Sequence, residues 1–436
     1  MKILILGSGG REHTFSWKIK ESKLCTELFI APGNAGTAQY GTNVEIGVND
    51  FEGLKAFCVS QKIEMVVVGP EEPLVNGIYD FFKNDEALKN IVITGPSKTG
   101  AQLEGSKAFS KKFMHRHKIP TAGYAEFTTQ NFEEGVDYIR NHSLPIVLKA
   151  DGLAAGKGVL ICQDHEEAVE EYSMMLRESK FGKAGNTVVI EEFLDGIELS
   201  VFILTDGKHY LLLPEAKDYK KIGEGDTGLN TGGMGAISPV PFATEHFMKM
   251  VVDRIVEPTV NGLQMDNIDY RGFIFFGLIK VNEEPLVIEY NSRMGDPETE
   301  VVLLRMKNDL VELFIDMDSQ KLDNHVIEIN EQSAATIVAV SGGYPGDYKK
   351  GIPIEFGYLD NPQAIKHLGE QGGAIVFHAG TTSSGKDIVT NGGRVLAVSA
   401  MADTLAETIE LSKEILDQIH FEGIYYRSDI GYEFID

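Results

Sequence analysis

The sequence predicts a multidomain protein that combines α/β and α+β folds, and three observations along the chain support this class. The chain has 436 residues, which is too long for one ordinary hydrophobic core. Strand and helix signals alternate over residues 1 to about 100, antiparallel strand signals dominate the middle, and the end is rich in strands and glycine. We therefore expect an N-terminal parallel α/β domain, a core of two subdomains and a small β-rich C-terminal domain. The expected bounds are 1–104, 105–327 and 328–436, with a lid subdomain at about 121–194.

The first domain is expected to be a parallel sheet with helices on both faces. KILIL is a buried strand that turns through GSGGREH into a helix, and ELFIA, EMVVV and IVITGPS continue the alternation. Ligands bind such a sheet at the carboxyl ends of its strands, where every glycine-rich turn of this segment lies.

The turn GSGGREH departs from a dinucleotide-binding fingerprint. Position 12 is Glu12 instead of glycine, and the second strand ends in APGNAG instead of an acid, so NAD is disfavoured. The turn is either an anion site at a helix N-terminus or a tight turn without a ligand. Glu71 in GPEEPL is likewise either a ligand for a polar substrate or a loop acid.

A glycine-rich loop, KADGLAAGKGV, follows the apolar run PIVL. It is not a Walker P-loop, because three residues separate Gly152 from Gly156 and Gly158 follows Lys157. Lys149 ends a buried strand, where an unpaired ammonium would be costly, so it needs a carboxylate or a phosphate partner. We favour a lid over phosphates; a glycine-rich hairpin with a surface lysine is the alternative.

Two further segments could hold a nucleotide and its metal. VVIEEFLDGIELS could offer backbone hydrogen bonds to an adenine edge, with Glu191 at the exocyclic amine and Glu198 at the ribose. In LVIEYNSRMGDPETE, Glu289 and Asn291 lie two apart on one strand face and carry the oxygen ligands that magnesium prefers. Arg293 continues that face as a phosphate partner. The alternatives are a plain strand and turn in the first case and a solvent-exposed sheet face in the second.

The loop DTGLNTGGMGA indicates either a backbone-lined site for a small ligand or a structural loop. The sequence has no Ser-His-Asp order, Cys-His pair or zinc spacing, and His13 is expected to be a packed helical histidine.

The composition excludes several classes of partner. The formal net charge is −25, which argues against nucleic acid and anionic membrane surfaces but not against a phosphorylated small molecule. No apolar run approaches the ~20 residues of a membrane span, and MKILILGSGG is too short for a signal peptide. Three cysteines without metal spacing fit a reducing compartment, so we expect a cytoplasmic protein.

Together these segments resemble the ATP-grasp fold, in which ATP lies between two α+β subdomains. From about Met1 to Ile430 the chain is similar to the phosphoribosylamine–glycine ligase (GAR synthetase) family. The resemblance implies that ATP activates the glycine carboxylate as glycyl phosphate, from which the nitrogen of phosphoribosylamine displaces phosphate. The product would be glycinamide ribonucleotide, a purine precursor. The motifs that carry the resemblance are GSGGREH, APGNAGT, VGPEEPLVNGI, GPSKTGAQLEGSKAF, KADGLAAGKGV, EEFLDG, DTGLNTGGMGA, NSRMGDPETE, SGGYPGDY, FHAGT and GGRVL.

The resemblance also implies roles for particular residues. ATP would be bound by Lys107, Lys149, Gly156, Lys157, Glu191, Glu192, Phe193, Leu194 and Glu198. Glu289 and Asn291 would bind Mg²⁺ or Mn²⁺, and the catalytic residues would be Arg293, Lys149 and Asp296. The other substrates would be bound by Gly10, Arg11, Asn34, Glu71, Asp218, Lys220, Asp296 and Arg394.

The chain departs from the family pattern at several positions. AKDYKK has Lys217 and Lys221 where Gln and Arg are usual, Leu229 replaces a proline, and SRMGDPE has Ser292 and Met294. FFGLIKV has no acid that faces the expected metal, so the ligands of a second metal are not assigned.

Three alternatives stay open. They are another ATP-grasp ligase with a different acid or amine, a nucleotide-binding regulatory protein without activity, and a dehydrogenase. Intact Glu289, Asn291 and Lys149 argue against the regulatory protein, and the missing third glycine and ribose acid argue against the dehydrogenase. We expect a monomer whose partners are ATP, glycine and phosphoribosylamine, without nucleic acid or membrane.

Overall fold

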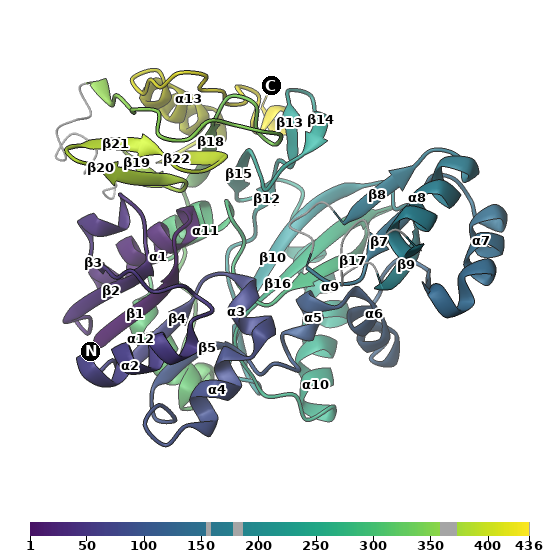
Figure 1. Cartoon of the computed structure of the whole chain (residues 1–436), viewed down its shortest axis with the longest axis horizontal. Coiled ribbons are helices and arrows are strands. Elements are labelled where there is room, and N and C mark those ends of the chain that lie inside the picture. Colours follow the sequence, from purple (N-terminus) through teal and green to yellow (C-terminus); the bar gives the residue numbers. More distant parts are fainter. Residues whose placement is uncertain (154–157, 178–185, 358–372, 436) are drawn as a thin grey trace.

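The computed structural model describes residues 1–153, 158–177, 186–357 and 373–435. Figure 1 shows a main body with a lobe that projects from one side. The elements form a nine-stranded sheet, a four-stranded sheet in the lobe, a five-stranded sheet near the C-terminus and two small hairpins within the described residues. This mixed architecture confirms the predicted fold class.

The N-terminal part of the large sheet is parallel, as predicted. Its strands are β1 (Lys2–Gly7), β2 (Glu27–Pro32), β3 (Thr42–Asn43), β4 (Met65–Val68) and β5 (Val92–Pro96). β1 lies between β2 and β4, and its apolar run is fully buried because helices cover both faces. The main covering helices are α1 (Gly10–Glu21), α2 (Phe51–Gln61), α3 (Glu71–Asn76) and α4 (Ile78–Asn84).

The same sheet continues into the antiparallel strands of the central segment. The beginning of β16 (Tyr270–Val281) pairs with β5, and β16 then pairs with β10 (Ile197–Thr205) and β17 (Glu284–Asn291). Beyond β10 lies β11 (Tyr210–Leu212). The turn NEE between GFIFFGLIKV and PLVIEYNSR predicts a hairpin, and β16 and β17 form it. Its turn residues Asn282 and Glu283 both have positive φ angles. One continuous sheet therefore carries both the N-terminal turns and the predicted metal strand.

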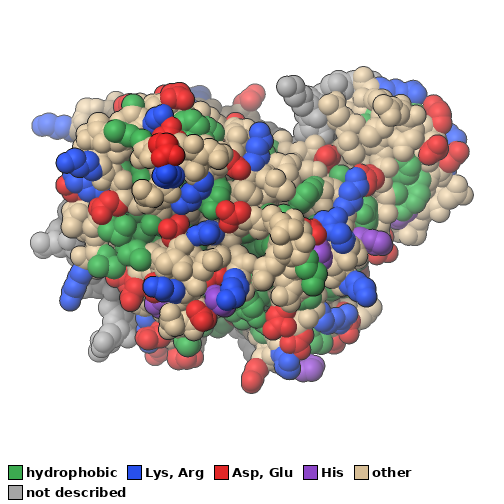
Figure 2. Space-filling view, turned by 90° about the horizontal axis from the view of Figure 1, so that it is seen from below, with side chains coloured by type: hydrophobic (Ala, Val, Ile, Leu, Met, Phe, Trp, Pro, Cys, Tyr) green, Lys and Arg blue, Asp and Glu red, His purple; other side chains and the backbone are tan. Residues whose placement is uncertain are grey.

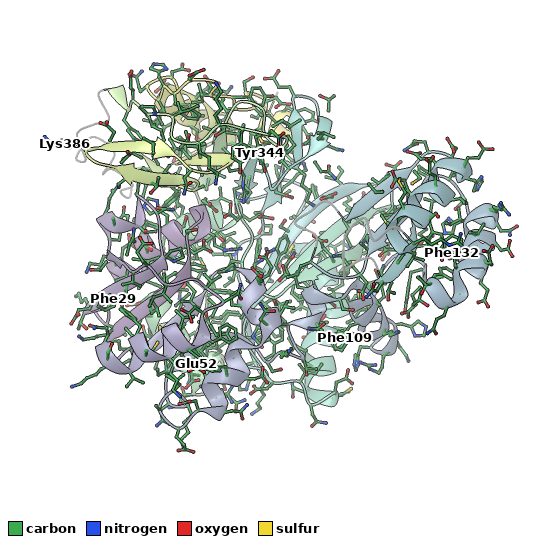
Figure 3. All side chains as sticks on the ribbon, in the orientation of Figure 1. Phe29, Glu52, Phe109, Phe132, Tyr344 and Lys386 are labelled. Carbon is green, nitrogen blue, oxygen red and sulfur yellow. The ribbon has the colours of Figure 1, made fainter. Side chains whose placement is uncertain are left out.

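The lobe is a separate sheet with its own core. Its strands run in the order β6 (Tyr124–Thr128), β9 (Thr187–Glu192), β7 (Ile146–Ala150) and β8 (Val159–Cys162). Helices α7 (Phe132–Asn141) and α8 (His165–Arg177) pack on it around Tyr172, and Figure 3 labels Phe132 in this lobe. The loop tip at 154–157, with the predicted residues Gly156 and Lys157, lies outside the described residues.

The C-terminal sheet takes strands from two parts of the chain. Its order is β12 (Lys217–Asp218), β15 (Gly235–Ser238), β18 (Ser333–Val340), β22 (Arg394–Ala402) and β19 (Gly373–His378). α13 (Leu405–Leu416) covers one face, and β20 (Thr381–Ser384) pairs with β21 (Asp387–Thr390) beside the sheet. Since β12 and β15 flank the loop DTGLNTGGMGA, this sheet holds that loop against the main body.

The remaining elements link these sheets. They are α5 (Gln102–Gly105), α6 (Lys107–Arg116), α9 (Glu245–Val251), α10 (Glu257–Met265), α11 (Thr299–Arg305), α12 (Leu310–Asp318) and the hairpin of β13 (Lys221–Gly223) and β14 (Thr227–Asn230).

Basic and acidic side chains are interspersed on the face drawn in Figure 2. No helix among the described residues is long and apolar enough to cross a membrane.

Candidate active site

A cavity of about 760 Å³ lies where the N-terminal turns, the lobe and the β16–β17 hairpin meet. It collects predicted site residues that are far apart in the sequence. Those that line it are Arg11, Glu71, Lys107, Lys149, Glu191, Glu192, Phe193, Leu194, Glu198, Asp218, Lys220, Glu289, Asn291, Arg293, Asp296 and Arg394. Gly10 and Asn34 are not in its lining.

Lys149 finds the anionic partner that its burial requires. Its Nζ lies 2.9 Å from Oε2 of Glu191 and donates to the carbonyl of Ile288 at 3.3 Å. The same Glu191 oxygen lies 3.2 Å from Nζ of Lys111, which was not predicted as a site residue. All three charged side chains are almost completely buried. The partner of Lys149 in this structure is therefore a carboxylate, at the wall of the cavity.

Lys107 begins helix α6 at the edge of the cavity. Asp151 accepts hydrogen bonds from Ser106 Oγ and from the amide of Ala108, which fixes the beginning of the helix to the end of β7. Lys107 Nζ donates to the carbonyl of Gly152 at 2.7 Å. Burial lowers the pKa of Lys107, the nearby Glu289 opposes that shift, and Lys149 adds to it. An anion between the two lysines would stabilise both charges.

The strand β17 presents the expected metal ligands to the cavity. Glu289 and Asn291 point the same way, whereas Tyr290 between them is buried in the core. The Glu289 carboxylate makes no hydrogen bond or ion pair with a described residue, and Asn291 Oδ1 accepts one 3.3 Å bond from Arg293. A carboxylate and an amide oxygen beside lysines that suit phosphate fit a hard divalent cation whose shell is completed by phosphate and water. Among the described residues, no three His, Cys, Asp or Glu side chains gather as a metal site.

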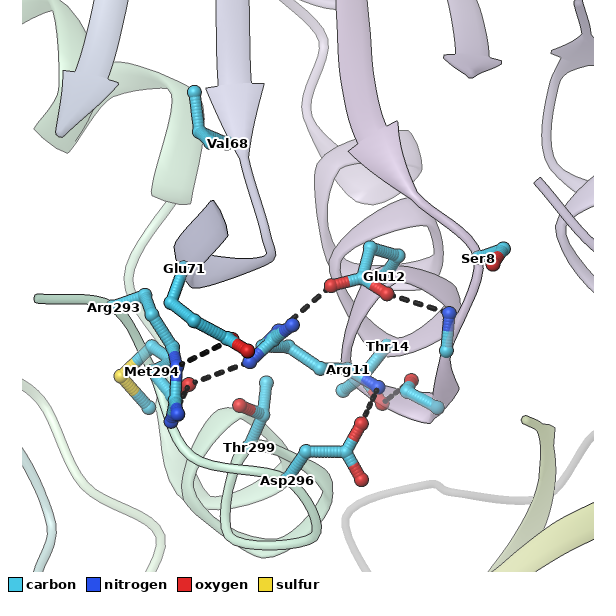
Figure 4. A network of polar contacts seen from close by, with 12 residues as sticks. Ser8, Arg11, Glu12, Thr14, Val68, Glu71, Arg293, Met294, Asp296 and Thr299 are labelled. Atoms are coloured by element: carbon cyan, nitrogen blue, oxygen red, sulfur yellow. Dashed lines mark hydrogen bonds and ion pairs between the residues drawn. The ribbon is translucent and has the colours of Figure 1, made fainter. Parts of the chain in front are cut away.

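Arg293 joins the end of β17 to the N-terminal domain. Its Nη2 lies 2.7 Å from Oε1 of Glu104. Its Nε lies 3.4 Å from Oε2 of Glu71 (Figure 4). Burial raises the pKa of Glu104, whereas Arg293 and Arg11 hold the pKa of Glu71 below its ordinary value against burial. Arg293 therefore neutralises two acids and still lines the cavity.

The turn GSGGREH supplies a second arginine. Arg11 Nε lies 2.7 Å from Glu12, and its Nη1 donates to the carbonyl of Met294 at 3.1 Å (Figure 4). Glu12 also accepts a hydrogen bond from the amide of Gly9 at 2.6 Å. The acid at position 12 therefore holds the turn closed, which explains why it stands where a dinucleotide fingerprint has glycine.

Asp296 and Arg394 link this cavity with a second one of about 680 Å³, which both residues also line. Arg394 Nη2 lies 3.0 Å from Asp296 Oδ1, and its Nη1 donates to the carbonyls of Gly232 and Asp296. The Gly232 amide also donates to the hydroxyl of Tyr344, which Figure 3 labels beside the C-terminal sheet. Burial raises the pKa of Asp296, but Arg394 and Arg11 more than offset it, so the net shift is downward and the carboxylate stays charged.

Asn34 lines this second cavity, where its side chain has a structural role. Its Oδ1 accepts hydrogen bonds from the amides of Gly36 at 2.8 Å and Thr37 at 3.0 Å. Its Nδ2 donates to the carbonyls of Ser8 and His378, both at 2.8 Å. The side chain thus ties the first glycine-rich turn to the C-terminal sheet.

We expect Asn34→Ala to lower the free energy of unfolding by about 2 kcal/mol, because it leaves buried amides and carbonyls without partners. Chemical denaturation measures the change. Asn76→Ala is the matched control, since that side chain makes one exposed hydrogen bond. A loss no larger than that of the control would contradict the structural role.

Glu198, Lys220 and Asp218 form a charged group on the far side of the cavity. Lys220 Nζ bonds to Glu198 and lies 3.9 Å from Asp218. Burial lowers the pKa of Lys220, but Asp218, Glu198 and Glu289 more than reverse this and keep it charged. Glu298 lies beside them, accepts from Ser200 Oγ at 3.0 Å, and has its pKa raised to about 7 by burial and by Asp218.

This shift predicts how Glu298 affects stability. Because the carboxyl holds its proton more tightly in the folded chain, its contribution to stability is lost as pH rises from 4.5 toward about 7. We expect Glu298→Gln to become progressively more stable relative to wild type over that pH range, as measured by thermal unfolding. The exposed Glu284→Gln serves as control. A difference from wild type that does not change with pH would contradict the prediction.

Several residues of the cavity wall were not predicted as site residues. They are Glu12, Glu104, Ser110, Lys111 and Glu298. Lys111 could have been found, because it stands four residues after Lys107 and so lies on the same helix face. Glu104 carries no such signal, since its partner Arg293 is distant in the sequence.

A lobe sheet over a central sheet, with buried lysines and an acid-bearing strand lining the cavity between them, defines an ATP-grasp enzyme. Three family descriptions match the chain: the N domain of phosphoribosylglycinamide synthetase over residues 1–104, its ATP-grasp domain over 105–299 and its C domain over 334–433. The chain belongs to this family, the phosphoribosylamine–glycine ligases.

Relatives and solved structures agree with this family. A phosphoribosylamine–glycine ligase of Escherichia coli K12 is 45% identical over 440 residues, covering 100% of this chain and 99% of the relative. One of Vibrio vulnificus YJ016 is 46% identical over 438 residues, with the same coverage. The crystal structure of the Thermotoga maritima phosphoribosylamine–glycine ligase matches with a TM-score of 0.83 and 34% identity, over 98% of this chain and 100% of that one.

A more distant structure shares the fold alone. The biotin carboxylase domain of Hydrogenobacter thermophilus 2-oxoglutarate carboxylase, crystallised with MgADP and bicarbonate, has a TM-score of 0.73 at 18% identity. It covers 98% of this chain and 92% of that one.

Proposed function

We propose that this chain joins glycine to phosphoribosylamine at the expense of ATP, giving glycinamide ribonucleotide, ADP and phosphate in purine biosynthesis. The observation that carries the proposal is the cavity that brings together Lys107 of α6, Lys149 of the lobe, the β17 side-chain oxygens and Arg11. The full-length relatives named for this reaction support the choice of substrates.

The nucleotide would lie between the lobe and the central sheet. Lys107 and Lys149 would contact its phosphates, together with Gly156 and Lys157 of the loop tip. Glu191, Glu192, Phe193 and Leu194 would surround adenine, and Glu198 would hold the ribose. The partly exposed Phe193 at the cavity wall fits a stacking partner for a base.

Glu289 and Asn291 would hold a divalent metal, which we propose to be Mg²⁺, with Mn²⁺ as a substitute. When bound, it would neutralise phosphate charge during transfer. The chain's own contribution is to aim two oxygen donors at the cavity from a rigid strand.

The chemistry needs no protein nucleophile. The glycine carboxylate attacks the γ-phosphorus of ATP, ADP leaves, and the acyl phosphate forms. The amine nitrogen of phosphoribosylamine then attacks the acyl carbon, phosphate leaves, and the nitrogen loses a proton. Arg293 and Lys149 stabilise charge on the transferring phosphoryl group, and Asp296 orients the amine.

The other two substrates would lie toward the N-terminal turns. Gly10, Arg11 and Glu71 would border them on one side, Asp218 and Lys220 on another, and Arg394 near the second cavity. Asn34 contributes by holding the turn Ser8–Gly9 in place.

The domain bounds, the oligomeric state and the cellular location are proposed as well. The domain bounds are 1–104, 105–327 and 328–436, with the lid at about 121–194. The protein works as a cytoplasmic monomer without nucleic-acid or membrane partners.

The test is ADP release from ATP and Mg²⁺, with glycine and freshly generated phosphoribosylamine added separately and together. We expect release only with both. Release with a different acid–amine pair would leave the fold class intact and overturn the substrates. Nucleotide binding without turnover for any pair would favour the regulatory alternative.

A further inference from the structure

Lys111 occupies an unusual position for a lysine. It lies on α6, one turn after Lys107, and its side chain is only 2% exposed. Its Nζ donates to Thr121 Oγ1 at 2.8 Å and to the carbonyl of Ala122 at 3.3 Å, and it lies 3.2 Å from Glu191 Oε2. An ammonium this deeply buried is costly, and its pKa is lowered to about 8 by burial. The burial of Lys111 among these partners therefore calls for a structural or functional explanation.

The two lysines use only one oxygen of Glu191. Lys149 and Lys111 both approach Oε2, at 2.9 and 3.2 Å. The other oxygen, Oε1, is buried and has no hydrogen-bond partner among the residues that the structure describes. A buried carboxylate oxygen without a donor costs free energy, so a donor from a ligand would be strongly favoured there. Ser110 Oγ, on the same helix and in the wall of the same cavity, is also buried without a described partner.

We propose that Lys111 is a positioning residue for the nucleotide base: it fixes Glu191 so that Oε1 faces the cavity and accepts a hydrogen bond from an exocyclic amine. This inference rests on the nucleotide site of the proposed function. Lys111 would then contribute to binding selectivity, favouring a base with an exocyclic amine over a base with a carbonyl at the same position. A carbonyl oxygen there would face the carboxylate oxygen with no proton between them.

The geometry explains why Lys149 alone would not suffice. Lys149 lies on β7, diagonally across from Glu191 on the paired strand β9, and could pair with either carboxylate oxygen as the Glu191 side chain turns. Lys111 approaches from a different element and is itself held by Thr121, which also donates to the carbonyl of Val287 on β17. Two cations from two directions fix the carboxylate plane, and Oε1 is left for the ligand.

The experiment is calorimetric binding of ADP and of inosine diphosphate, which carries a carbonyl in place of the amine, to the full chain with Mg²⁺. We expect the wild type to bind ADP at least about 10-fold more tightly, since a site built for a donor rejects a ligand that lacks it. In Lys111→Met the ratio of the two dissociation constants should fall to about 3-fold or less, mainly through weaker ADP binding. Lys112→Met, with an exposed side chain on the same helix, should keep the wild-type ratio.

The possible results distinguish the role of Lys111 from the existence of the nucleotide site. A Lys111→Met ratio equal to wild type, or equal weakening of both nucleotides, would overturn the role of Lys111. Wild-type protein that binds neither nucleotide would instead overturn the nucleotide site of the proposed function. If Lys111→Met does not fold, Glu191→Gln provides the test. The glutamine amide can present an N–H to the base, so this variant should lose the preference for ADP. An unchanged preference would count against the proposal.

Discussion

Replacing Arg293 by methionine is expected to lower kcat by about 10³-fold and to destabilise the protein. Removing one well-placed donor from a transition state costs about 3–4 kcal/mol, which corresponds to two to three powers of ten. The same change leaves the carboxyl of Glu104 buried without its 2.7 Å partner. Breaking a buried ion pair in this way costs about 3–5 kcal/mol. Steady-state kinetics and thermal unfolding measure the two effects.

Arg293→Lys separates the two effects. Lysine keeps the positive charge and should restore much of the stability, but it lacks the planar fork that meets Glu104 and Glu71 together. We expect its kcat to stay well below wild type. An Arg293→Met variant that retains kcat within about 3-fold would contradict the role of Arg293 in phosphoryl transfer.

Replacing Glu289 by alanine is expected to reduce turnover by a similar factor for a different reason. Glu289 carries the carboxylate that we propose as a metal ligand, and metal stabilisation of transition-state charge contributes several kcal/mol. We expect kcat/KM to fall by about 10³-fold and the Mg²⁺ concentration for half-maximal ADP binding to rise. Folding should change little, because the side chain makes no ion pair or hydrogen bond with a described residue.

A control variant on the same strand and the Mg²⁺ dependence of the Glu289 variant test this prediction. Glu284→Ala removes an acid from the same strand, where the side chain is exposed and paired with Arg254, and should leave both metal dependence and turnover near wild type. A Glu289→Ala protein whose Mg²⁺ dependence equals that of wild type would show that the metal is held elsewhere.

The sequence was sufficient to predict the fold class, because strand and helix periodicities are local. It also predicted most of the charged residues of the cavity lining, since residues such as Lys149, Glu289 and Arg293 stand in short recognisable motifs. The β16–β17 hairpin followed from the short turn NEE between two apolar runs.

What the sequence did not predict depends on contacts between distant segments. Lys111 meets Glu191 across 80 positions of the chain, and Glu104 meets Arg293 across 189, so neither pair leaves a local pattern. The participation of β12 and β15 in the C-terminal sheet is of the same kind, because a strand of two to four residues has too little pattern to show its partner.

The sequence also left the partner of Lys149 open between a carboxylate and a phosphate. The structure shows a carboxylate, Glu191, at 2.9 Å. A phosphate could still approach from the cavity side, because Lys149 lines the cavity while it pairs with Glu191.

The most direct test of the proposed mechanism follows the oxygen atoms of glycine. Glycine labelled with ¹⁸O in both carboxylate oxygens is converted with ATP and phosphoribosylamine, and the released phosphate is analysed by mass spectrometry. If the carboxylate attacks the γ-phosphorus, each phosphate formed carries one ¹⁸O and the amide product keeps the other. Phosphate without label would contradict the acyl phosphate route and with it the function proposed for this cavity.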